Sequence, residues 1–483
     1  MKLEELLQSV ETLEVKGSSD IEITEIAYDS RRVVPGGLFV AVRGHKADGA
    51  HYVSEALSSG AVAVVSENGL ELGTAAVHIR VPCARRALAE IANAYHGDLS
   101  RRMKVVGVTG TNGKTTTTHM IRDVLRDGGF LPGLLGTVTY DVGGHALPAP
   151  RTTPEALDLH SLFRQMYDAG CDSVVMEVSS HAIALQRTHG IDFDISVFTN
   201  LTQDHLDYHK DMETYFEVKS RLFHDQGSNH SVVVNTDDSW GRRLLEGEKV
   251  VANVVTYGFN EQAMVRATDV KMDADRTCFQ VSSPWGEAQV CLNLLGRFNI
   301  SNALAALAAG GLCGIDLGRM AVSLKNIQAI PGRLELVANR KHKKVFVDYA
   351  HTDDALRNVL GTLREICKGK LIVVFGCGGD RDRGKRKLMG EAAAELADFC
   401  IITSDNPRTE DPCAISADIA EGFAGNEAFK VVLDRYDAIK KGIRKTGRKD
   451  ILLIAGKGHE TYQELKNTII PFDDRETVRE IIG

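Results

Sequence analysis

The chain has 483 residues, too many for one hydrophobic core, and domains of ordinary size predict about three units. Hydrophobic residues make up 43% and charged residues 25% of the chain, and the net charge of -8 argues against a general nucleic-acid binder. No run approaches the roughly 20 apolar residues that span a bilayer, and the N-terminus does not resemble a signal peptide. The nine cysteines show no metal-binding spacing. We therefore expect a cytoplasmic protein with reduced cysteines and no membrane insertion.

Two polar loops stand out in the first part of the chain, where residues 1–102 predict a small α/β domain. Ser30 belongs to the first loop, which precedes a Pro-Gly-Gly turn and a strand. His45 and Lys46 belong to the second loop, ahead of a predicted helix. Ordinary turn chemistry explains these residues, and their concentration only suggests an anionic ligand.

A glycine-rich loop separates a predicted strand over 103–109 from a predicted helix over 115–127. Such a loop presents backbone N–H groups and a helix N-terminus to phosphate. Lys114 can reach the β- and γ-phosphates, and the hydroxyl of Thr115 or Thr116 can contact Mg²⁺. The spacing differs by one residue from the general P-loop pattern, and an ordinary strand–helix turn is the alternative. We predict a nucleotide phosphate site made of Gly110, Thr111, Asn112, Gly113, Lys114, Thr115 and Thr116.

A carboxylate interrupts the apolar strand predicted over 172–178. Because an unpaired buried charge is costly, Glu177 needs a partner. A Mg²⁺ ion held near Thr115 would provide one, and a buried salt bridge is the alternative. We favour the metal, since Ser179, Ser180 and His181 follow directly.

Two histidines and two aspartates lie within six residues of each other after the strand predicted over 195–199, from Asp204 to His209. This composition suggests a zinc site, but no paired second ligand motif accompanies it. We favour ATP-facing roles, in which His205 or His181 either assists proton removal or orders the groups around the metal, and the sequence does not separate these two roles.

The helix predicted over 212–223 carries Lys219, which the residue pattern alone predicts to be an exposed helix lysine. Further on, Asn299 and Asn302 lie three residues apart, on one face of a long alanine-rich helix. Helix capping explains one of these asparagines but not both.

Strands alternate with helices from residue 344 onward, which predicts a mostly parallel sheet. Pro331 marks the second boundary, so the predicted domains are 1–102, 103–331 and 332–483. Ligands gather at the carboxyl ends of such strands. Four polar, glycine-rich segments follow the predicted strands, at 348–351, 376–383, 405–410 and 456–460. In the second segment, aspartates alternate with basic residues. This mixture of charges favours recognition of a carboxylate over binding of nucleic acid.

These motifs together resemble the Mur ligases, which add amino acids to the peptide of a cell-wall precursor. The resemblance spans the whole chain and rests on Gly110–Thr115, Glu177–His181, Gly296–Asn299, Pro331–Arg333 and Asp348–His351. It implies three α/β domains: a small N-terminal UDP-precursor-binding domain, a central P-loop ATPase-like domain and a C-terminal Rossmann-like domain that binds the amino acid.

The segment Asp405-Asn406-Pro407-Arg408 resembles the motif of members that add meso-diaminopimelate, whereas lysine-adding members lack the arginine. This difference has a physical basis, because meso-diaminopimelate carries a second carboxylate that Arg408 can bind with a bidentate pair. The resemblance implies an amino-acid site made of Arg381, Asp405, Asn406, Pro407, Arg408, Gly456 and Glu460, with Glu460 facing the distal ammonium.

The resemblance assigns roles to further residues. It implies contacts with a UDP-muramoyl dipeptide from Ser30, His45, Lys46, Thr152, Thr153, Ser179 and Arg187. It implies that Asn299, Arg333 and Asp348 lie on the adenosine side of the ATP site. It implies that Lys219 is carbamylated, and the carbamate could hold a second Mg²⁺ beside the one expected near Thr115 and Glu177. Two departures are Leu185, where some relatives have glutamine, and Asp353, where proline is common.

The implied activity is ATP-dependent ligation of meso-diaminopimelate to UDP-N-acetylmuramoyl-L-alanyl-D-glutamate through an acyl phosphate. Lys114, Glu177, His205 and Lys219 are the implied catalytic residues. We expect a monomer that binds small molecules and no nucleic acid. The alternatives are a lysine-adding ligase, a folylpolyglutamate synthetase-like ligase, and a P-loop ATPase that regulates a partner without ligating anything.

Overall fold

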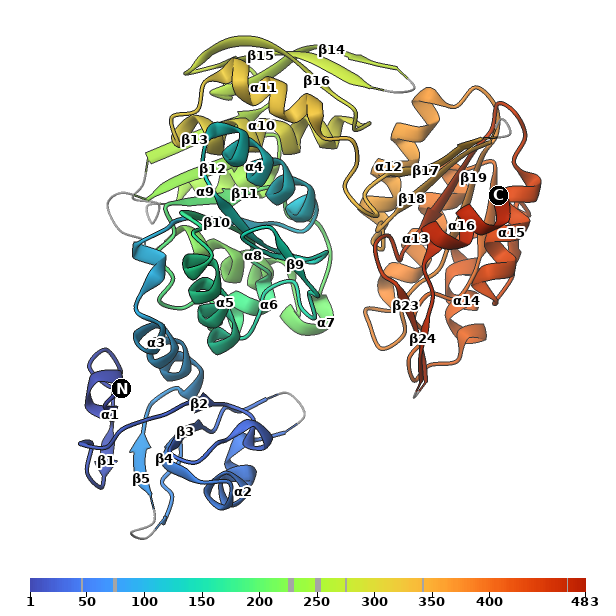
Figure 1. The fold of residues 1–483 in the computed structure, drawn as a ribbon. Helices are drawn as coiled ribbons and strands as arrows, with labels where there is room; N and C mark the ends of the chain where they lie inside the picture. The colour runs from blue at the N-terminus through green and yellow to red at the C-terminus, as the bar shows by residue number, and fades with distance from the viewer. Residues whose placement is uncertain are drawn as a thin grey trace.

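Three β-sheets, each covered by helices, follow one another along the chain (Figure 1). They form the N-terminal, central and C-terminal parts of the molecule. The computed structural model describes residues 1–44, 47–72, 76–224, 230–247, 253–273, 276–340, 343–466 and 468–483. His45 and Lys46 therefore lie outside the described residues.

The N-terminal part is built on a five-stranded sheet with the order β1-β5-β4-β3-β2, in which only β1 is antiparallel to its neighbour. Its strands are β1 (Glu14–Lys16), β2 (Ile26–Ala27), β3 (Gly37–Val40), β4 (Ala61–Ser66) and β5 (Val77–Arg80). Its helices are α1 (Leu3–Leu6), α2 (Val53–Ser58) and α3 (Ala84–His96), with short 3₁₀ turns at Ser30–Arg32, Gly49–Tyr52 and Leu99–Arg101.

The central part contains an eleven-stranded sheet with the order β16-β15-β14-β13-β12-β11-β6-β10-β7-β8-β9. Its middle strands, from β14 to β7, are parallel, and both edges are antiparallel hairpins. The strands are β6 (Lys104–Thr109), β7 (Pro132–Leu135), β8 (Tyr140–Val142), β9 (His145–Leu147), β10 (Ser173–Glu177), β11 (Ile195–Phe198), β12 (Ser231–Asn235), β13 (Asn253–Gly258), β14 (Val265–Met272), β15 (Thr277–Ser283) and β16 (Gly286–Leu292).

Helices cover both faces of this central sheet, which explains why its parallel strands are nearly continuous apolar runs. In Figure 1, α10 and α11 lie beneath the curved strands β14–β16. The helices are α4 (Lys114–Gly128), α5 (Ala156–Asp168), α6 (Ser180–Ala184), α7 (Leu206–His209), α8 (Met212–Ser220), α9 (Ser239–Glu246), α10 (Arg297–Leu312) and α11 (Leu317–Asn326), with a 3₁₀ turn at Arg221–Phe223.

The C-terminal part has a six-stranded sheet with the order β17-β18-β22-β19-β20-β21, in which only β17 is antiparallel. This confirms the predicted mostly parallel sheet. A separate hairpin, β23–β24, follows the last of its strands. The strands are β17 (Glu335–Arg340), β18 (Lys343–Asp348), β19 (Leu371–Phe375), β20 (Phe399–Ile402), β21 (Phe429–Val431), β22 (Ile451–Ala455), β23 (Tyr462–Leu465) and β24 (Thr468–Pro471). The helices are α12 (Asp353–Ile366), α13 (Gly384–Leu396), α14 (Pro412–Ala420), α15 (Arg435–Lys445) and α16 (Asp474–Ile482), with a 3₁₀ turn at Glu421–Phe423.

A disulfide joins Cys278 to Cys291, so the expectation that every cysteine is reduced is wrong. The antiparallel register of β15 and β16 places these residues directly opposite each other, with their Cα atoms 4.1 Å apart. Side chains at such positions are near neighbours, although 13 positions separate them in sequence. Separately, within the described residues no helix is long and apolar enough to cross a membrane.

Side-chain pairs link the N-terminal part to α5 of the central part. The Tyr28 hydroxyl donates to Asp158 Oδ2 at 2.5 Å, and Arg32 Nη1 lies 3.4 Å from the other oxygen of the same carboxylate. Arg85 pairs with Glu155, just before α5, at 3.5 Å. These contacts position the loop that carries Ser30 relative to the central sheet.

Candidate active site

A cavity of about 500 Å³ lies between the central and C-terminal parts. This volume falls within the range of small-molecule sites. The predicted site residues that line it are Thr111, Asn112, Gly113, Lys114, Thr115, Thr116, Thr152, Glu177, Ser179, His205, Lys219, Arg333 and Asp348. Gly110 and Asn299 are not among the residues that line the cavity.

The topology of the central sheet brings these residues together. Strands β12, β11, β6 and β10 are parallel neighbours, so their carboxyl ends meet at one edge. The glycine-rich loop leaves β6 at that edge, Glu177 ends β10, and Asn200 follows β11. The site therefore lies where ligands bind open parallel sheets.

The backbone of the glycine-rich loop lies too close to its neighbours for side chains at two positions. A Cβ atom on Gly110 would lie 1.9 Å from Thr199 Oγ1, and one on Gly113 would lie 2.5 Å from Asn302 Oδ1. Gly113 also has φ +86°, which favours glycine. The loop thus presents its amides at the start of α4, as an anion site requires.

Lys114 is turned back onto its own loop. Its Nζ donates to the carbonyl oxygens of Gly110 at 2.9 Å and Thr111 at 2.8 Å. Burial lowers the pKa of Lys114, and the nearby Glu177 opposes that change. The ammonium has neutral oxygens as partners, so a phosphate would be a stronger acceptor for it.

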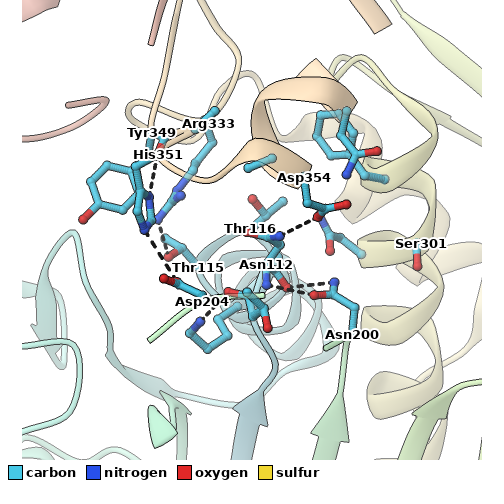
Figure 2. A pocket seen from close by; sticks show the side chains of 18 of the residues that line it. Asn112, Thr115, Thr116, Asn200, Asp204, Ser301, Arg333, Tyr349, His351 and Asp354 are labelled. Carbon is cyan, nitrogen blue, oxygen red and sulfur yellow. Dashed lines mark hydrogen bonds and ion pairs between the residues drawn. The ribbon is translucent and has the colours of Figure 1, made fainter. Parts of the chain in front are cut away.

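Residues of the C-terminal part contact the glycine-rich loop directly (Figure 2). Asn112 Nδ2 donates to Asp354 Oδ2 at 2.8 Å, and Arg333 Nη2 donates to Thr115 Oγ1 at 2.8 Å. His351 Nε2 lies 3.8 Å from Asp204 Oδ2. The cavity is therefore closed by two domains rather than contained in one.

Glu177 is a buried carboxylate that has hydrogen-bond donors but no ion pair among the described residues. Its side chain accepts from the backbone N–H of Thr137 at 2.8 Å and the Thr137 hydroxyl at 3.1 Å, and the residue is 1% exposed. The alternative of a buried salt bridge is therefore wrong for these residues. A buried carboxylate that faces a cavity and lacks a cationic partner fits a divalent cation.

Lys219 is buried, so the helix-pattern prediction of an exposed lysine is wrong. Its Nζ donates to the Gly110 carbonyl at 2.9 Å, beneath the glycine-rich loop. Burial lowers the pKa of Lys219 well below its usual value, and the charge of Lys114 adds to the effect. The sequence held a clue to this burial, because Tyr215 and Leu222 lie four residues before and three residues after Lys219 on the apolar face.

Two histidines face each other beside the cavity. The rings of His181 and His205 are 4.9 Å apart, and His205, which lines the cavity, has φ +54°. Burial lowers the pKa of both imidazoles, and for His205 the value falls to about 3. Both rings are therefore neutral near neutral pH. No group of three His, Cys, Asp or Glu side chains in the described part of the chain is arranged to hold a metal ion.

The two predicted asparagines of α10 form a short hydrogen-bonded chain. Asn299 is buried and donates to the Leu295 carbonyl at 2.8 Å, while Asn302 Nδ2 donates to Asn299 Oδ1 at 3.1 Å. The Thr117 hydroxyl donates to Asn302 Oδ1 at 3.2 Å. Asn302 is thus the member that reaches the glycine-rich loop, and Asn299 holds it in place.

The carboxylate of Asp348 binds backbone N–H groups at the boundary between the central and C-terminal parts. It accepts from the backbone N–H groups of Leu334 at 2.6 Å and Ala350 at 2.7 Å. Burial raises the pKa of Asp348 despite these bonds and the positive charge of Arg333. The Arg333 guanidinium lies over the Tyr349 ring, 4.7 Å from its centre.

Sequence reasoning missed the apolar end of the cavity. Phe259, Phe298 and Val359 line it there, and the Arg297 guanidinium lies 4.4 Å from the centre of the Phe259 ring. Aromatic rings and a guanidinium form a surface on which a flat base can stack. These residues come from three distant segments: Arg297 and Phe298 belong to the motif Gly296–Asn299, whereas Phe259 and Val359 resemble ordinary core or surface residues in the sequence.

The seven residues predicted to bind the amino acid form a second group outside the lining of the cavity. We call this group the tip cluster; it consists of Arg381, Asp405, Asn406, Pro407, Arg408, Gly456 and Glu460. Its members follow the carboxyl ends of β19, β20 and β22, which are neighbours in the C-terminal sheet. Asn406 Nδ2 donates to Glu460 Oε2 at 3.0 Å.

Lys457 was not predicted, but it lies at the centre of the tip cluster. Its buried Nζ donates to Asn406 Oδ1 at 3.0 Å and Glu460 Oε2 at 2.8 Å.

Four of the residues predicted to bind the muramoyl peptide lie together beside Glu177. Thr153 Oγ1 donates to the Glu177 carbonyl at 2.9 Å and contacts Ser179 Oγ at 3.3 Å. Arg187 Nη1 donates to the Thr153 carbonyl at 3.1 Å, and the Thr152 hydroxyl lies 3.0 Å from that of Thr137. Ser30 is not part of this group. It is buried in the N-terminal part, where it donates to Glu55 at 2.7 Å.

Family models match all three parts of the chain. The Mur ligase middle domain matches residues 108–310, the Mur ligase glutamate ligase domain matches 332–458, and the Mur ligase family catalytic domain matches 22–96. A protein of Caldanaerobacter subterraneus subsp. tengcongensis, named UDP-N-acetylmuramoyl-L-alanyl-D-glutamate--2,6-diaminopimelate ligase, is 42% identical over 100% of this chain and 99% of its own length. The chain belongs to the Mur ligase family.

Further relatives and solved structures agree with this membership. A Geobacter metallireducens protein of the same name is 44% identical over 99% of this chain and 98% of its own length. A solved structure of a UDP-N-acetylmuramoyl-L-alanyl-D-glutamate--2,6-diaminopimelate ligase superposes with a TM-score of 0.70 and 33% identity, covering 100% of this chain and 98% of that one. MurF from Acinetobacter baumannii, at 17% identity and a TM-score of 0.70, covers 100% of this chain and 98% of its own, and shares the fold. The three-domain α/β architecture is therefore that of a Mur ligase.

Proposed function

We propose that this Mur ligase joins meso-diaminopimelate to the D-glutamyl carboxylate of UDP-N-acetylmuramoyl-L-alanyl-D-glutamate, with hydrolysis of ATP to ADP and phosphate. The observation that carries the substrate assignment is Arg408, whose guanidinium belongs to the tip cluster beside Asn406 and Glu460. Full-length relatives at 42–44% identity bear the name of this activity. An arginine offers a second carboxylate a paired, charge-assisted hydrogen bond that L-lysine has no group to use.

ATP would occupy the cavity, with its phosphates at the amides of Gly110–Thr116 and its base among the aromatic residues at the apolar end. The adenosine side of the ATP would be held by Asn299, Arg333 and Asp348. Of these, Arg333 and Asp348 line the cavity, and Asn299 acts through Asn302.

The reaction would begin with transfer of the γ-phosphoryl group to the D-glutamyl carboxylate, giving an acyl phosphate and ADP. Lys114 would leave its carbonyl partners and offset charge on the moving phosphoryl group. The amine of diaminopimelate would then attack the acyl carbon, and phosphate would leave. His205, which lines the cavity, would assist removal of the proton from the attacking amine.

Thr115, Glu177 and Lys219, as its carbamate, would hold Mg²⁺. Glu177 supports this assignment because it is buried and, in the described chain, its carboxylate has only the N–H and hydroxyl of Thr137 as partners. One or two protein carboxylates together with substrate phosphates suit Mg²⁺. The ion would offset negative charge on the phosphates.

Lys219 is well suited to carbamylation. Only a neutral amine reacts with carbon dioxide, and burial lowers the pKa of Lys219 well below its usual value. The product is a carboxylate on a long side chain, which places a negative charge near Lys114.

The UDP-muramoyl dipeptide would extend from the N-terminal part to Glu177. Thr152, Thr153, Ser179 and Arg187 would hold its peptide end, since they lie together beside the backbone of Glu177. Ser30, His45 and Lys46 would hold its nucleotide end. We retain 1–102, 103–331 and 332–483 as the proposed domains.

The protein would act as a monomer on these small molecules, and a reaction that consumes ATP and a UDP-linked precursor suits the cytoplasm. The direct test is mass spectrometry of the product after incubation with the UDP-linked dipeptide, ATP, Mg²⁺ and meso-diaminopimelate. We expect the dipeptide to gain one diaminopimelate residue. ATP hydrolysis without a heavier product would refute the proposal in favour of a non-ligating ATPase.

A further inference from the structure

Arg408 is held from two sides, by one residue that sequence reasoning identified and one that it did not. Its Nη1 donates to the Gly379 carbonyl at 2.7 Å, and its Nε donates to Glu464 Oε2 at 2.9 Å. Gly379 belongs to a segment already assigned to the carboxyl edge of the sheet. Glu464 lies on β23 of the separate hairpin, outside every motif described above.

These two contacts determine which part of the guanidinium faces a ligand. A guanidinium has five N–H donors in one plane. The bonds to Gly379 and Glu464 use one N–H of Nη1 and the N–H of Nε. One N–H of Nη1 and two of Nη2 remain for other acceptors, and neighbouring N–H donors of a guanidinium match the two oxygens of a carboxylate.

The β23–β24 hairpin is fastened to the backbone around Arg408. Glu464 accepts at its carbonyl from the Arg408 N–H at 3.2 Å and donates from its own N–H to Asn406 Oδ1 at 3.0 Å. Gln463 Nε2 donates to the Asp405 carbonyl at 2.7 Å. Arg408 itself has φ +52°, a conformation that non-glycine residues adopt at some cost. The hairpin thus fixes both the backbone and the side chain of Arg408.

We infer that Glu464 is a positioning residue for Arg408 and thereby determines specificity for an amino acid with a distal carboxylate. This inference rests on the proposed function, because it assumes that Arg408 binds that carboxylate. Glu464 does not touch the substrate in this account. It orients the guanidinium through its hydrogen bond to Nε, so less conformational freedom is lost when the substrate binds.

The opposite effect of Glu464 is physically possible and leads to a different prediction. Its negative charge lies near the position that the substrate carboxylate would take, so repulsion alone would weaken binding. If repulsion dominated, removal of Glu464 would lower the KM for meso-diaminopimelate. The positioning account predicts that the KM rises.

The first experiment compares Glu464→Ala and Glu464→Gln with the wild type in the complete ligase assay. In Glu464→Ala the side chain of Arg408 is freed, and it must be ordered again when the substrate binds. We therefore expect the KM for meso-diaminopimelate to rise by about 3- to 10-fold. The KM values for ATP and for the UDP-linked dipeptide should stay unchanged. Glu464→Gln keeps an oxygen that can accept from Nε, so it should recover most of the wild-type KM.

The second experiment is a double-mutant cycle with Arg408→Ala. If Glu464 acts through Arg408, Glu464→Ala should add little to the KM of the Arg408→Ala variant. A full additional effect in that background would overturn the inference. Failure of Arg408→Ala itself to raise the KM would instead contradict the proposed function, so the two failures are distinguishable.

Glu395→Ala is a matched control, since Glu395 also pairs with an arginine of the C-terminal part, Arg357. It should leave all three KM values at the wild-type level. Both ion pairs are partly exposed, and such pairs contribute little to stability, so the variants should fold. An unchanged or lower KM for meso-diaminopimelate in Glu464→Ala would overturn the inference, as would a glutamine variant that behaves like alanine.

Discussion

Three ionisable side chains of the cavity have no opposite charge in direct contact within the described part of the chain, and of these Lys219 and Glu177 are buried while Lys114 is half-buried. Lys114 and Lys219 donate to backbone carbonyls, and Glu177 accepts from Thr137. Burial lowers the pKa of both lysines. Such groups are costly in a folded protein unless a ligand completes their environment, so the cavity is suited to phosphate and a divalent cation.

Replacement of Lys219 with alanine should nearly abolish ligation, because the proposed carbamate would be lost. Loss of a metal ligand predicts a fall of at least about 100-fold in kcat. Lys219→Glu restores a carboxylate on a shorter side chain and should regain part of the activity. Steady-state ADP release measures both variants, and wild-type kcat in Lys219→Ala would disprove the role of the carbamate.

Protonation of Glu410 should make the protein less stable in acid. The hydrogen bond from Arg386 lowers the pKa of Glu410 to about 2, from 4.5. The resulting stabilisation is complete above pH 4.5 and is lost as the pH falls toward 2. We expect the free energy of unfolding to drop by about 1–2 kcal/mol across this window, since solvent partly screens the pair.

Urea unfolding at several pH values measures this effect. Glu410→Gln should be less stable than the wild type at pH 7 and should show a smaller loss between pH 4.5 and pH 2. Glu395→Gln serves as the control. An identical pH dependence in wild type and Glu410→Gln would contradict the assignment to Glu410.

At the scale of elements, the strand–loop–helix unit around Gly113 could be predicted from the sequence. Apolar strand residues, glycines and a following helix all indicate the same local structure, and α4 begins at Lys114 as that pattern requires. The burial of Lys219 could not be predicted in the same way, because it depends on the packing of α8 beneath β6. The disulfide depends likewise on the register of β15 and β16, which periodicity does not fix.

Gly113→Ala tests whether the loop has the geometry of a phosphate site. The alanine Cβ would lie 2.5 Å from Asn302 Oδ1 at φ +86°. We expect a destabilisation of more than about 1 kcal/mol and a weaker affinity for ATP, because the loop must shift. Calorimetric titration with a non-hydrolysable ATP analogue measures the affinity.

Gly129→Ala is the control, because Gly129 also has a positive φ, +103°, but its Cβ would meet no atom within 4 Å. It should lose stability without losing affinity for the analogue. Equal affinity in Gly113→Ala and the wild type would show that the loop amides do not bind the phosphates.

At the scale of the whole molecule, the cavity lies between the central and C-terminal parts of the chain rather than within one of them. The cavity requires Asn112 from the central part and Asp354 from the C-terminal part, 242 positions apart. Sequence patterns identified the carboxyl ends of the strands and most polar residues there. The aromatic end of the cavity, Lys457 and Glu464 were missed, because each depends on how distant segments meet.

Asp158 couples the N-terminal part to the central part through Tyr28 and Arg32. Asp158→Ala should raise the KM for the UDP-linked dipeptide several-fold, because that substrate would contact both parts. The KM for ATP should not change. Asp168→Ala, on the same helix but paired locally with Arg164, is the control. Equal increases in both KM values would indicate general destabilisation instead.

The central claim is that the tip cluster selects an amino acid with a distal carboxylate. The most direct measurement is ADP release by the wild type with the UDP-linked dipeptide and ATP, in the presence of meso-diaminopimelate, L-lysine or no amino acid. We predict turnover with meso-diaminopimelate and little with L-lysine or without an amino acid. Turnover with L-lysine equal to that with meso-diaminopimelate would contradict the role of Arg408.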